Sequence, residues 1–326
     1  MEFSLEELRE AAEFVHRYVP PTAQYAWPLL AADAGCVVWV KHENHTPVGA
    51  FKVRGGALYV HELLQREPGC PGVIAATKGN HGQSITVAAR AQGLDAVIVV
   101  PAGNNPEKND AMAAQGAELI VHGDDFQDAL EYAQALAKER GLHIVPSFDS
   151  ALVRGVASYA LELFDTADPL DAVYVPIGLG SGICGVIAVR NALGLKTEII
   201  GVQAEGAPSY ALSFSAGHPV STNSIDTFAD GLATRVPVAE AVEMINANAA
   251  RVVTVTDHAI LEAQRLLLRA THNLAEPAGA APLAALLAER ERMAGKTVAV
   301  VVSGGNADAT NLKMLVDDVS GVGRSA

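Results

Sequence analysis

Short apolar runs alternate with helical patterns along most of this chain, and that alternation most constrains its fold. The runs, one series before residue 150 and one after it, are 36–40, 73–76, 96–100, 118–121, 143–146, 172–175, 199–203, 252–255 and 297–302. The helical patterns between them begin near His81, at Pro106 and at Asp124, and later span 153–164, 183–193, 258–271 and 280–292. Such alternation at short spacing indicates βαβ units built around parallel sheets.

The length of the chain favours two such sheets. At 326 residues it is long for one compact core, so we expect two domains. A cleft between two domains is a common place for a ligand site. The least regular stretch, 213–229, is expected to be a surface loop over that site. The predicted fold is α/β, with two mainly parallel twisted sheets flanked by helices and an active site in the interdomain cleft.

Charge and composition exclude several classes of function. The net charge of -14 argues against a nucleic-acid partner, since neutralising phosphates requires a basic face, and it is read as an aid to solubility. Cys36, Cys70 and Cys184 lie far apart, which gives no disulfide framework and fits a reducing compartment. No apolar run is long enough to span a bilayer, and the first residues do not resemble a signal peptide. We expect a soluble, cytoplasmic protein without a membrane partner.

One lysine lies at a junction between a turn and a helical pattern. Lys52 follows a turn at 46–49 that contains proline and glycine, and it precedes a helical pattern through 57–60. The positive end of a helix dipole disfavours the charged form of an amine placed there. A neutral lysine amine is a nucleophile that can form a Schiff base with a carbonyl. A solvated lysine on a helix face is the other reading, and this segment alone does not separate the two.

Glycine-containing turns that follow strands provide further candidate binding segments. In Thr77-Lys78-Gly79-Asn80-His81 the turn exposes backbone N–H groups that suit a carboxylate or phosphate, and the asparagine adds a side-chain donor. In Gly178-Leu179-Gly180-Ser181-Gly182 alternating glycines let the backbone wrap an anion at a helix N-terminus. In Ser303-Gly304-Gly305-Asn306 the serine hydroxyl can bond a pyridine nitrogen without protonating it. An ordinary turn or helix N-cap is the simpler reading of each segment taken singly.

In this order the lysine, the asparagine loop, the glycine loop and the terminal Ser-Gly-Gly resemble the fold-type II pyridoxal-phosphate enzymes, the tryptophan synthase β-like family. The resemblance extends from about Lys41 to Asn306 and is closest to the threonine/serine dehydratases, or ammonia-lyases. It implies pyridoxal 5'-phosphate as cofactor, with Lys52 as the Schiff-base lysine and with Lys52 and Lys78 as the catalytic residues. The implied cofactor-binding residues are Phe51, Lys52, Asn80, Gly178, Leu179, Gly180, Ser181, Gly182, Glu276 and Ser303. The implied substrate-binding residues are Thr77, Lys78, Gly79, Asn80 and His81.

The resemblance also implies a domain division and a reaction. Residues 1–55 and 150–326 would form a large cofactor-binding domain, and 56–149 a small domain that carries the asparagine loop, with no regulatory domain. The expected reaction is β-elimination of water from a β-hydroxy amino acid, threonine or serine, giving a 2-oxo acid and ammonia. A bulkier substrate, phenylserine or 3-hydroxyaspartate, is the alternative, and a non-catalytic cofactor-binding protein is a remote one. We expect a small amino-acid substrate and a homodimer.

Departures from the family pattern bear on substrate and cofactor. Lys78 stands where relatives usually have serine or alanine, so it could be a second acid/base, a partner for a substrate carboxylate, or a solvent-pointing residue. Tyr25 and Trp27 replace the usual residues near the N-terminus, and together with Lys78 they favour a larger or more polar substrate side chain. Ala211 stands where metal-binding relatives carry an acid, so no divalent metal is expected there. A nicotinamide cofactor is disfavoured, because neither register of the dinucleotide fingerprint supplies its third glycine in the glycine loop.

Several other polar residues are interpreted as structural and not as part of a functional site. His42 and His45 sit three apart but lack a supporting carboxylate pattern, so they are read as a turn surface. Asp33 and Glu43 are read as helix caps or solvated faces. The Asp124-Asp125 pair is read in the same way.

Overall fold

The computed structural model describes residues 1–317, and the core of this part of the chain is built on two β-sheets. The larger sheet takes its strands from both halves of the chain, in the order β1 (Gln24–Ala26), β2 (Val37–His42), β10 (Thr297–Val302), β7 (Ala172–Pro176), β8 (Glu198–Ala204) and β9 (Arg251–Val255). β1 runs antiparallel to β2, and the other neighbouring pairs are parallel. The late strand β10 therefore lies in the middle of the sheet, between β2 and β7.

Both faces of the larger sheet are buried, as its apolar strands predict. Along β10, Val298, Val300 and Val302 pack into one hydrophobic cluster, and Ala299 and Val301 pack into another on the opposite face. Alternate residues of a strand point to opposite faces, so an unbroken apolar run marks a strand covered on both sides. The covering helices are α2 (Pro28–Ala34), α11 (Asp257–Thr271) and α12 (Pro277–Ala288) on one face, and α7 (Ser150–Thr166), α8 (Ser181–Ala192) and α10 (Ala239–Asn248) on the other.

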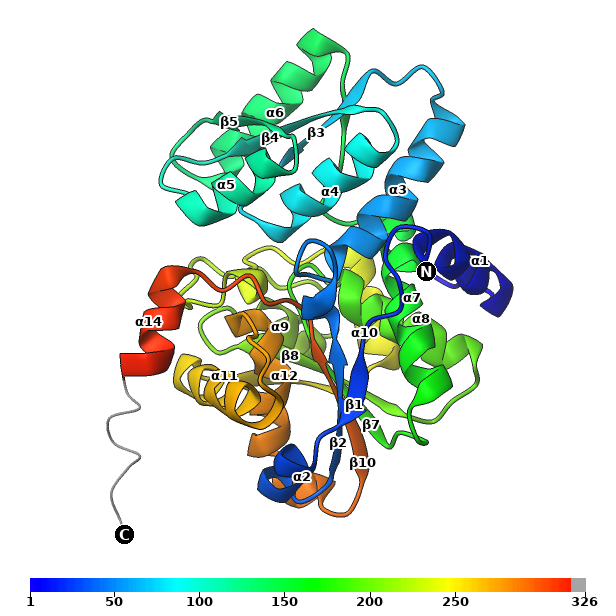
Figure 1. Cartoon of the computed structure of the whole chain (residues 1–326), viewed down its shortest axis with the longest axis vertical. Helices are drawn as coiled ribbons and strands as arrows, with labels where there is room; N and C mark the ends of the chain where they lie inside the picture. The colour runs from blue at the N-terminus through cyan, green and yellow to red at the C-terminus, as the bar shows by residue number, and fades with distance from the viewer. Residues whose placement is uncertain (318–326) are drawn as a thin grey trace.

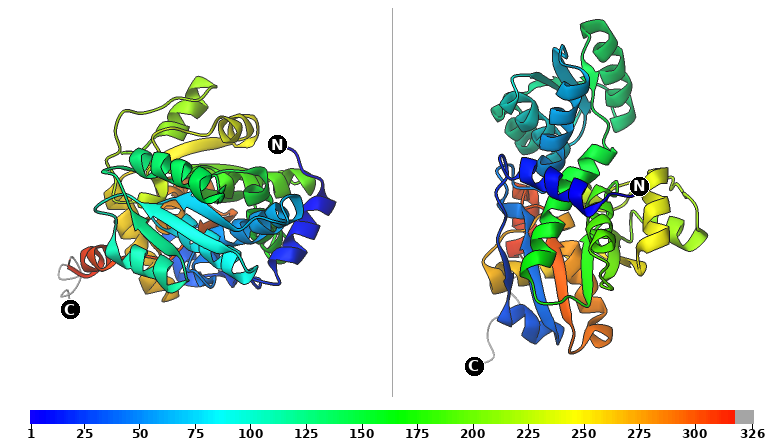
Figure 2. Two further views of the ribbon diagram at one scale, coloured as in Figure 1. Left: turned by 90° about the horizontal axis from the view of Figure 1, so that it is seen from above. Right: turned by 90° about the vertical axis from the view of Figure 1, so that its right-hand side faces the viewer.

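The smaller sheet is parallel throughout and has the order β5 (Glu118–Val121), β4 (Asp95–Val100), β3 (Gly72–Ala76) and β6 (His143–Ile144). Its faces are covered by α3 (Lys52–Arg66), α4 (Asn80–Ala91) and α5 (Pro106–Ala114) on one side and by α6 (Phe126–Arg140) on the other. Figure 1 shows this sheet and its helices as an upper lobe above the larger sheet, and the side view in Figure 2 separates the same two lobes. The prediction of an α/β fold with mainly parallel sheets flanked by helices is confirmed.

The remaining elements complete the two lobes and the join between them. They are α1 (Leu5–Val15), the 3-10 turns η1 (Glu43–His45) and η2 (Asp230–Leu232), α9 (Ser209–Ala216), α13 (Arg290–Met293) and α14 (Ala309–Asp317). The predicted domain boundary after residue 55 falls inside α3, which runs from the larger-sheet lobe into the upper lobe (Figure 1), and the boundary after residue 149 falls at the start of α7. That division stays a prediction. Within residues 1–317, no helix combines the length and apolar character needed to cross a membrane.

Some element bounds differ from the predicted ones for local reasons. α6 begins at Phe126 because Asp125 is its N-cap and accepts hydrogen bonds from two backbone N–H groups. α9 carries helix into the stretch 213–229 that was expected to be irregular, and Gly217, with φ of +77°, ends it. Pro277 in the first turn of α12 starts that helix before residue 280.

Candidate active site

Backbone pairing holds Lys52 beside the end of β10. Ala50 forms an isolated antiparallel bridge with Gly304, and the Phe51 N–H donates to the Ser303 carbonyl at 3.0 Å. Ser303 follows directly after β10, and Lys52 is the first residue of α3. The predicted Schiff-base lysine and the predicted partner of the pyridine nitrogen therefore belong to adjoining, hydrogen-bonded segments, although they come from opposite ends of the chain.

The surroundings of Lys52 favour its neutral amine. Its Nζ lies 5.2 Å from the centre of the Phe51 ring. Burial lowers the pKa of Lys52, and the nearby carboxylate of Glu276 opposes that shift only in part. The helix dipole acts in the same direction as burial, because Lys52 occupies the first turn of α3. A lowered pKa leaves more of the amine unprotonated at neutral pH, as a nucleophile or base requires.

A chain of side-chain hydrogen bonds orients Asn80. Its Nδ2 donates to Glu276 Oε1 at 2.8 Å, and its Oδ1 accepts from Asn306 Nδ2 at 2.8 Å. Asn306 Nδ2 also donates to the Val48 carbonyl at 2.9 Å. Because an amide nitrogen carries two hydrogens, Asn80 keeps a second N–H for a ligand. Burial raises the pKa of Glu276, although the hydrogen bond from Asn80 opposes the shift.

Buried tyrosines that the sequence analysis missed shape the glycine loop. Gly180 has φ of +103°, a left-handed conformation that favours glycine. Tyr210 OH donates to the Leu179 carbonyl at 2.7 Å, and Tyr159 OH donates to the Gly182 carbonyl at 3.1 Å. Burial raises the pKa of both phenols, so both stay protonated and can donate. These bonds fix the loop before and in the first turn of α8, where unpaired N–H groups at a helix N-terminus can bind an anion; that the glycine loop does so stays a prediction.

The residues present fit a phosphorylated pyridine aldehyde. A Cβ at Gly178 would lie 2.5 Å from the Gly231 carbonyl, so glycine keeps the loop closely packed against neighbouring backbone. The other groups of the set are the Lys52 amine, the buried Ser303 hydroxyl and the Asn80 amide. An aldehyde, a pyridine nitrogen, a ring oxygen and a phosphate each find a group of matching chemistry in this set and the glycine loop.

The predicted substrate-binding residues of the loop before α4 differ in burial. Thr77 is buried, and its Oγ1 accepts from the Gly79 N–H at 3.2 Å. His81 is 8% exposed, and its Nε2 has no hydrogen-bond partner among residues 1–317. Burial and then the nearby Lys52 lower the pKa of His81 to about 3, so its ring is neutral at neutral pH. Lys78 is exposed, and its role as an acid/base or charge partner stays a prediction.

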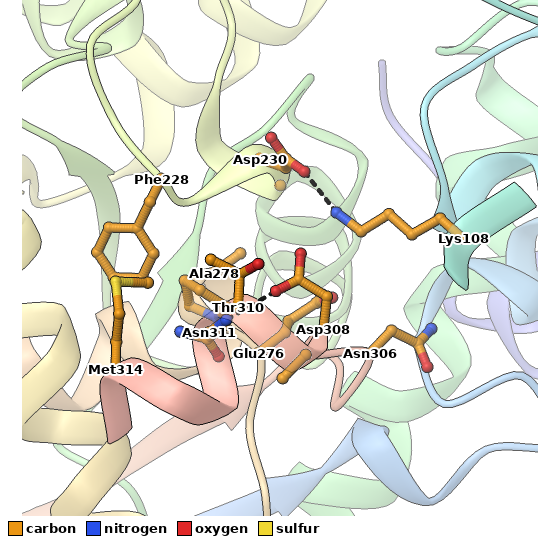
Figure 3. Close-up of a pocket in the computed structure, with 13 residues that line it drawn as sticks. Lys108, Phe228, Asp230, Glu276, Ala278, Asn306, Asp308, Thr310, Asn311 and Met314 are labelled. Carbon is orange, nitrogen blue, oxygen red and sulfur yellow. Dashed lines mark hydrogen bonds and ion pairs between the residues drawn. The ribbon is translucent and has the colours of Figure 1, made fainter. Parts of the chain in front are cut away.

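A cavity of about 100 Å³ opens beside Glu276 (Figure 3). Its walls come from α5, η2, the start of α12 and the segment that leads into α14. Lys108 forms an ion pair with Asp230 above Glu276 in this view, and Phe228 and Met314 bound the other side. Because Glu276 both lines the cavity and binds Asn80, the cavity adjoins the predicted cofactor residues.

Further polar contacts join α5 of the upper lobe to the larger-sheet lobe around this cavity. Asn105 Nδ2 donates to Asp308 Oδ2 at 2.6 Å, and the Ala309 N–H donates to Glu107 Oε1 at 3.1 Å. Together with the ion pair just described, they connect the N-cap and two first-turn residues of α5 to the segments that flank the cavity. The side chain of Lys108 also lies against the loop before α4, since a Cβ at Gly79 would come within 3.3 Å of its Cδ.

Glu43 and His42 were predicted to lie at the surface, and both are buried. Glu43 is fully buried rather than solvated, and it accepts hydrogen bonds from Arg54 at 2.7 and 3.0 Å. His42 is buried rather than on a turn surface, accepts from Trp27 Nε1 at 3.1 Å, and stacks on His45. Burial and then His45 lower the pKa of His42 to about 4. His42 is the last residue of the buried strand β2 and Glu43 follows it directly, whereas a prediction based on apolar runs ends the strand at residue 40.

Tyr25 and Trp27, the aromatic residues that favoured a bulky substrate, lie away from the cavity beside Glu276. Tyr25 is 54% exposed and lines a separate hollow with His16 and Glu162. Trp27 packs against the hydrophobic cluster under α2. Neither residue lines the cavity beside Glu276. Within the described part of the chain, no group of three or more His, Cys, Asp or Glu residues is arranged to hold a metal ion.

Comparisons with known proteins agree with this geometry. A family model described as pyridoxal-phosphate dependent enzyme matches residues 15–304. The L-threonine ammonia-lyase of Thermotoga maritima is 31% identical over 315 residues, which cover 96% of this chain and 78% of that protein. The processed form of threonine deaminase isoform 2 from Solanum lycopersicum has a TM-score of 0.89 at 27% identity and covers 97% of this chain and 94% of its own. Maize serine racemase has a TM-score of 0.89 at 26% identity, with 96% of each chain covered.

Proposed function

The chain belongs to the pyridoxal-phosphate dependent enzyme family, and on that premise we propose that it removes water from a β-hydroxy amino acid of the threonine or serine type. The products are a 2-oxo acid and ammonia. The observation that carries the proposal is the Lys52 amine, which has a lowered pKa and is tied by its neighbour Phe51 to the segment of Ser303. The similarity to a threonine ammonia-lyase over nearly the whole chain supports the choice of reaction.

When bound, pyridoxal phosphate supplies an aldehyde that captures amines and a ring that withdraws electrons from the substrate Cα. The neutral amine of Lys52 would hold the cofactor aldehyde and, when free, would accept the proton from the substrate Cα. Ser303 would offer the pyridine nitrogen a hydroxyl that does not protonate it, and a ring that stores less charge would favour loss of the β-hydroxyl from the substrate. Asn80, oriented by Glu276, would donate its second N–H to the ring oxygen of the cofactor.

The substrate is bound, on this proposal, by the loop before α4. The buried Thr77 and the neutral, unpaired Nε2 of His81 lie where a carboxylate can be held by hydrogen bonds. Threonine and serine are favoured over phenylserine, because Tyr25 and Trp27 do not line the cavity beside Glu276. The expected homodimer is part of the same proposal and is tested by light scattering of the purified protein.

The test is a 2-oxo acid assay across threonine, serine, phenylserine and 3-hydroxyaspartate in both configurations. We expect turnover of L-threonine or L-serine and its loss in Lys52→Ala. Release of 2-oxo acid at the wild-type rate by Lys52→Ala would exclude the role of this lysine. Turnover of phenylserine faster than threonine would exclude the small-substrate assignment, and absence of 2-oxo acid from every substrate would exclude the reaction.

A further inference from the structure

Arg54 lies two residues after Lys52 and is fully buried. Its Nε and Nη2 donate to Glu43 at 2.7 and 3.0 Å. Its Nη1 and Nη2 donate to Glu162 at 2.6 and 3.1 Å, and Nη1 also donates to Ser158 Oγ at 3.1 Å. Carboxylates therefore bind the guanidinium along two edges, which is the paired geometry to which arginine is suited.

The carboxylates come from separate elements, so Arg54 joins parts of the chain that are distant in sequence. Glu43 begins η1 directly after β2, and Glu162 lies on α7. Lys41, near the end of β2, donates to Glu162 and balances the second negative charge. Although burial opposes the shift, Arg54 and Lys41 lower the pKa of Glu162, so that its carboxylate stays charged. Because buried ion pairs are costly to desolvate, such a cluster is better explained by the geometry it imposes than by stability alone.

Close contacts hold the first turn of α3 on its other sides. Ser84 Oγ donates to the Lys52 carbonyl at 2.6 Å. A Cβ at Gly55 would lie 2.7 Å from the Leu152 carbonyl, and a Cβ at Gly56 would lie 2.3 Å from Ser84 Oγ. The start of α3 is thus packed against α7 and α4 with no room for a side chain at Gly55 or Gly56, and Arg54 connects it to Glu43 of η1.

We propose that Arg54 is a positioning residue, which fixes the first turn of α3 through Glu43 and Glu162 and thereby aims the Lys52 amine. The consequence for turnover rests on the proposed function. The consequence for attachment of pyridoxal phosphate to Lys52 does not, because attachment requires only the aligned amine. Arg54 makes no contact with the cofactor site in this scheme and acts entirely through the backbone of α3.

The test compares Arg54→Lys with Arg154→Lys. Lysine keeps the charge of Arg54 but cannot bind two carboxylates along two edges. Arg154 is a matched control, because its Nη2 donates to both Glu62 oxygens at 2.8 and 2.7 Å and so joins the same helices, α7 and α3, near the other end of α3. Each full-length variant is loaded with pyridoxal phosphate, and the attachment rate is followed by the visible absorbance of the cofactor on Lys52.

We expect Arg54→Lys to reduce both kcat and the attachment rate at least about tenfold, with KM within about threefold, because both steps need an aligned amine. Arg154→Lys should leave both rates within about twofold. Equal rates in the two variants would overturn the proposal. If Arg54→Lys is insoluble, Glu43→Gln, which keeps the volume of the side chain, takes its place in the same comparison.

The remaining outcomes are also decisive. Failure of both Arg54→Lys and Glu43→Gln to fold while Arg154→Lys folds would overturn the proposal, because the cluster would then serve the fold and not the position of Lys52. A wild-type protein that releases no 2-oxo acid, together with slow attachment in Arg54→Lys alone, would exclude the proposed function and support the role of Arg54.

Discussion

Replacing Gly155 by alanine should separate the position of Lys52 from the stability of the fold. Gly155 lies on α7 where that helix meets α3 most closely. A Cβ there would lie 2.5 Å from the Arg54 carbonyl oxygen and 2.8 Å from the Gly55 Cα. Both are backbone atoms, so neither can rotate away. Since non-bonded carbon contacts are most favourable at about 3.5–4.0 Å, the first turn of α3 must move by roughly 1 Å.

The expected magnitudes differ strongly between stability and rate. Overpacking a buried contact costs about 1–3 kcal/mol of unfolding free energy, and exchanging glycine for alanine inside a helix returns about 1 kcal/mol. The net loss of stability in Gly155→Ala is therefore at most about 2 kcal/mol. A displacement of about 1 Å at a reacting group can reduce the rate about a hundredfold. Gly155→Ala should therefore fold, bind the cofactor slowly and turn over about a hundredfold more slowly.

The assay measures thermal unfolding and kcat for the best substrate on the same preparation. Gly69→Ala is the control, because a Cβ there meets no atom within 4 Å and the residue does not have a left-handed backbone conformation. It should leave both quantities unchanged. Wild-type kcat in Gly155→Ala would refute the argument that the contact of α3 with α7 sets the position of Lys52. A loss of stability large enough to account for the lost activity would refute the same argument.

Other predictions address the amine, the join between the lobes and the glycine loop. In the cofactor-free protein, modification of Lys52 by an amine reagent should reach half its maximal rate at a pH below the ordinary lysine pKa of about 10.4, because burial lowers its pKa; a midpoint at or above that value would contradict this. Lys108→Ala removes the partly exposed ion pair with Asp230, so stability should change by less than about 1 kcal/mol. Because both residues line the cavity beside Glu276, KM should rise several-fold, and an unchanged KM would exclude a role of the pair in shaping that cavity. Tyr210→Phe removes the donor to the Leu179 carbonyl and should weaken cofactor binding about tenfold in equilibrium dialysis, which unchanged affinity would rule out.

The strands were predictable from the sequence wherever both of their faces are apolar. β10 and β7 coincide closely with their apolar runs, because residues 298–302 and 172–175 alternate between the two clusters that flank the larger sheet. β2 was predicted at 36–40, but it spans Val37–His42. Its register with β10 pairs Val301 with Lys41 and Val302 with His42, so backbone pairing continues after the apolar residues end. A polar pair at the end of a buried strand resembles the start of a loop until its partners are known.

The candidate site was predictable to the extent that its chemistry is local. A lysine at the start of a helix, an asparagine after a strand and a glycine loop before a helix each carry their turn chemistry in a few adjacent residues. The tyrosines that bind the glycine loop are not local, because Tyr159 reaches it from α7 and Tyr210 from α9. Nothing in the residues around them indicates that their hydroxyl groups bind that backbone, so sequence patterns alone do not identify them.

At the first turn of α3, the spacing of Lys52 and Arg54 is local in sequence, but the partners of Arg54 are distant. An α-helix advances about 100° per residue, so residues two apart point to roughly opposite sides of the helix. Lys52 and Arg54 therefore cannot both face the cofactor, and the structure directs Arg54 to carboxylates at residues 43 and 162. The Lys-x-Arg spacing is then itself informative. We expect that whatever holds the arginine also limits where the lysine amine can point, and on this proposal the burial of Glu43 serves the candidate active site as well as the fold.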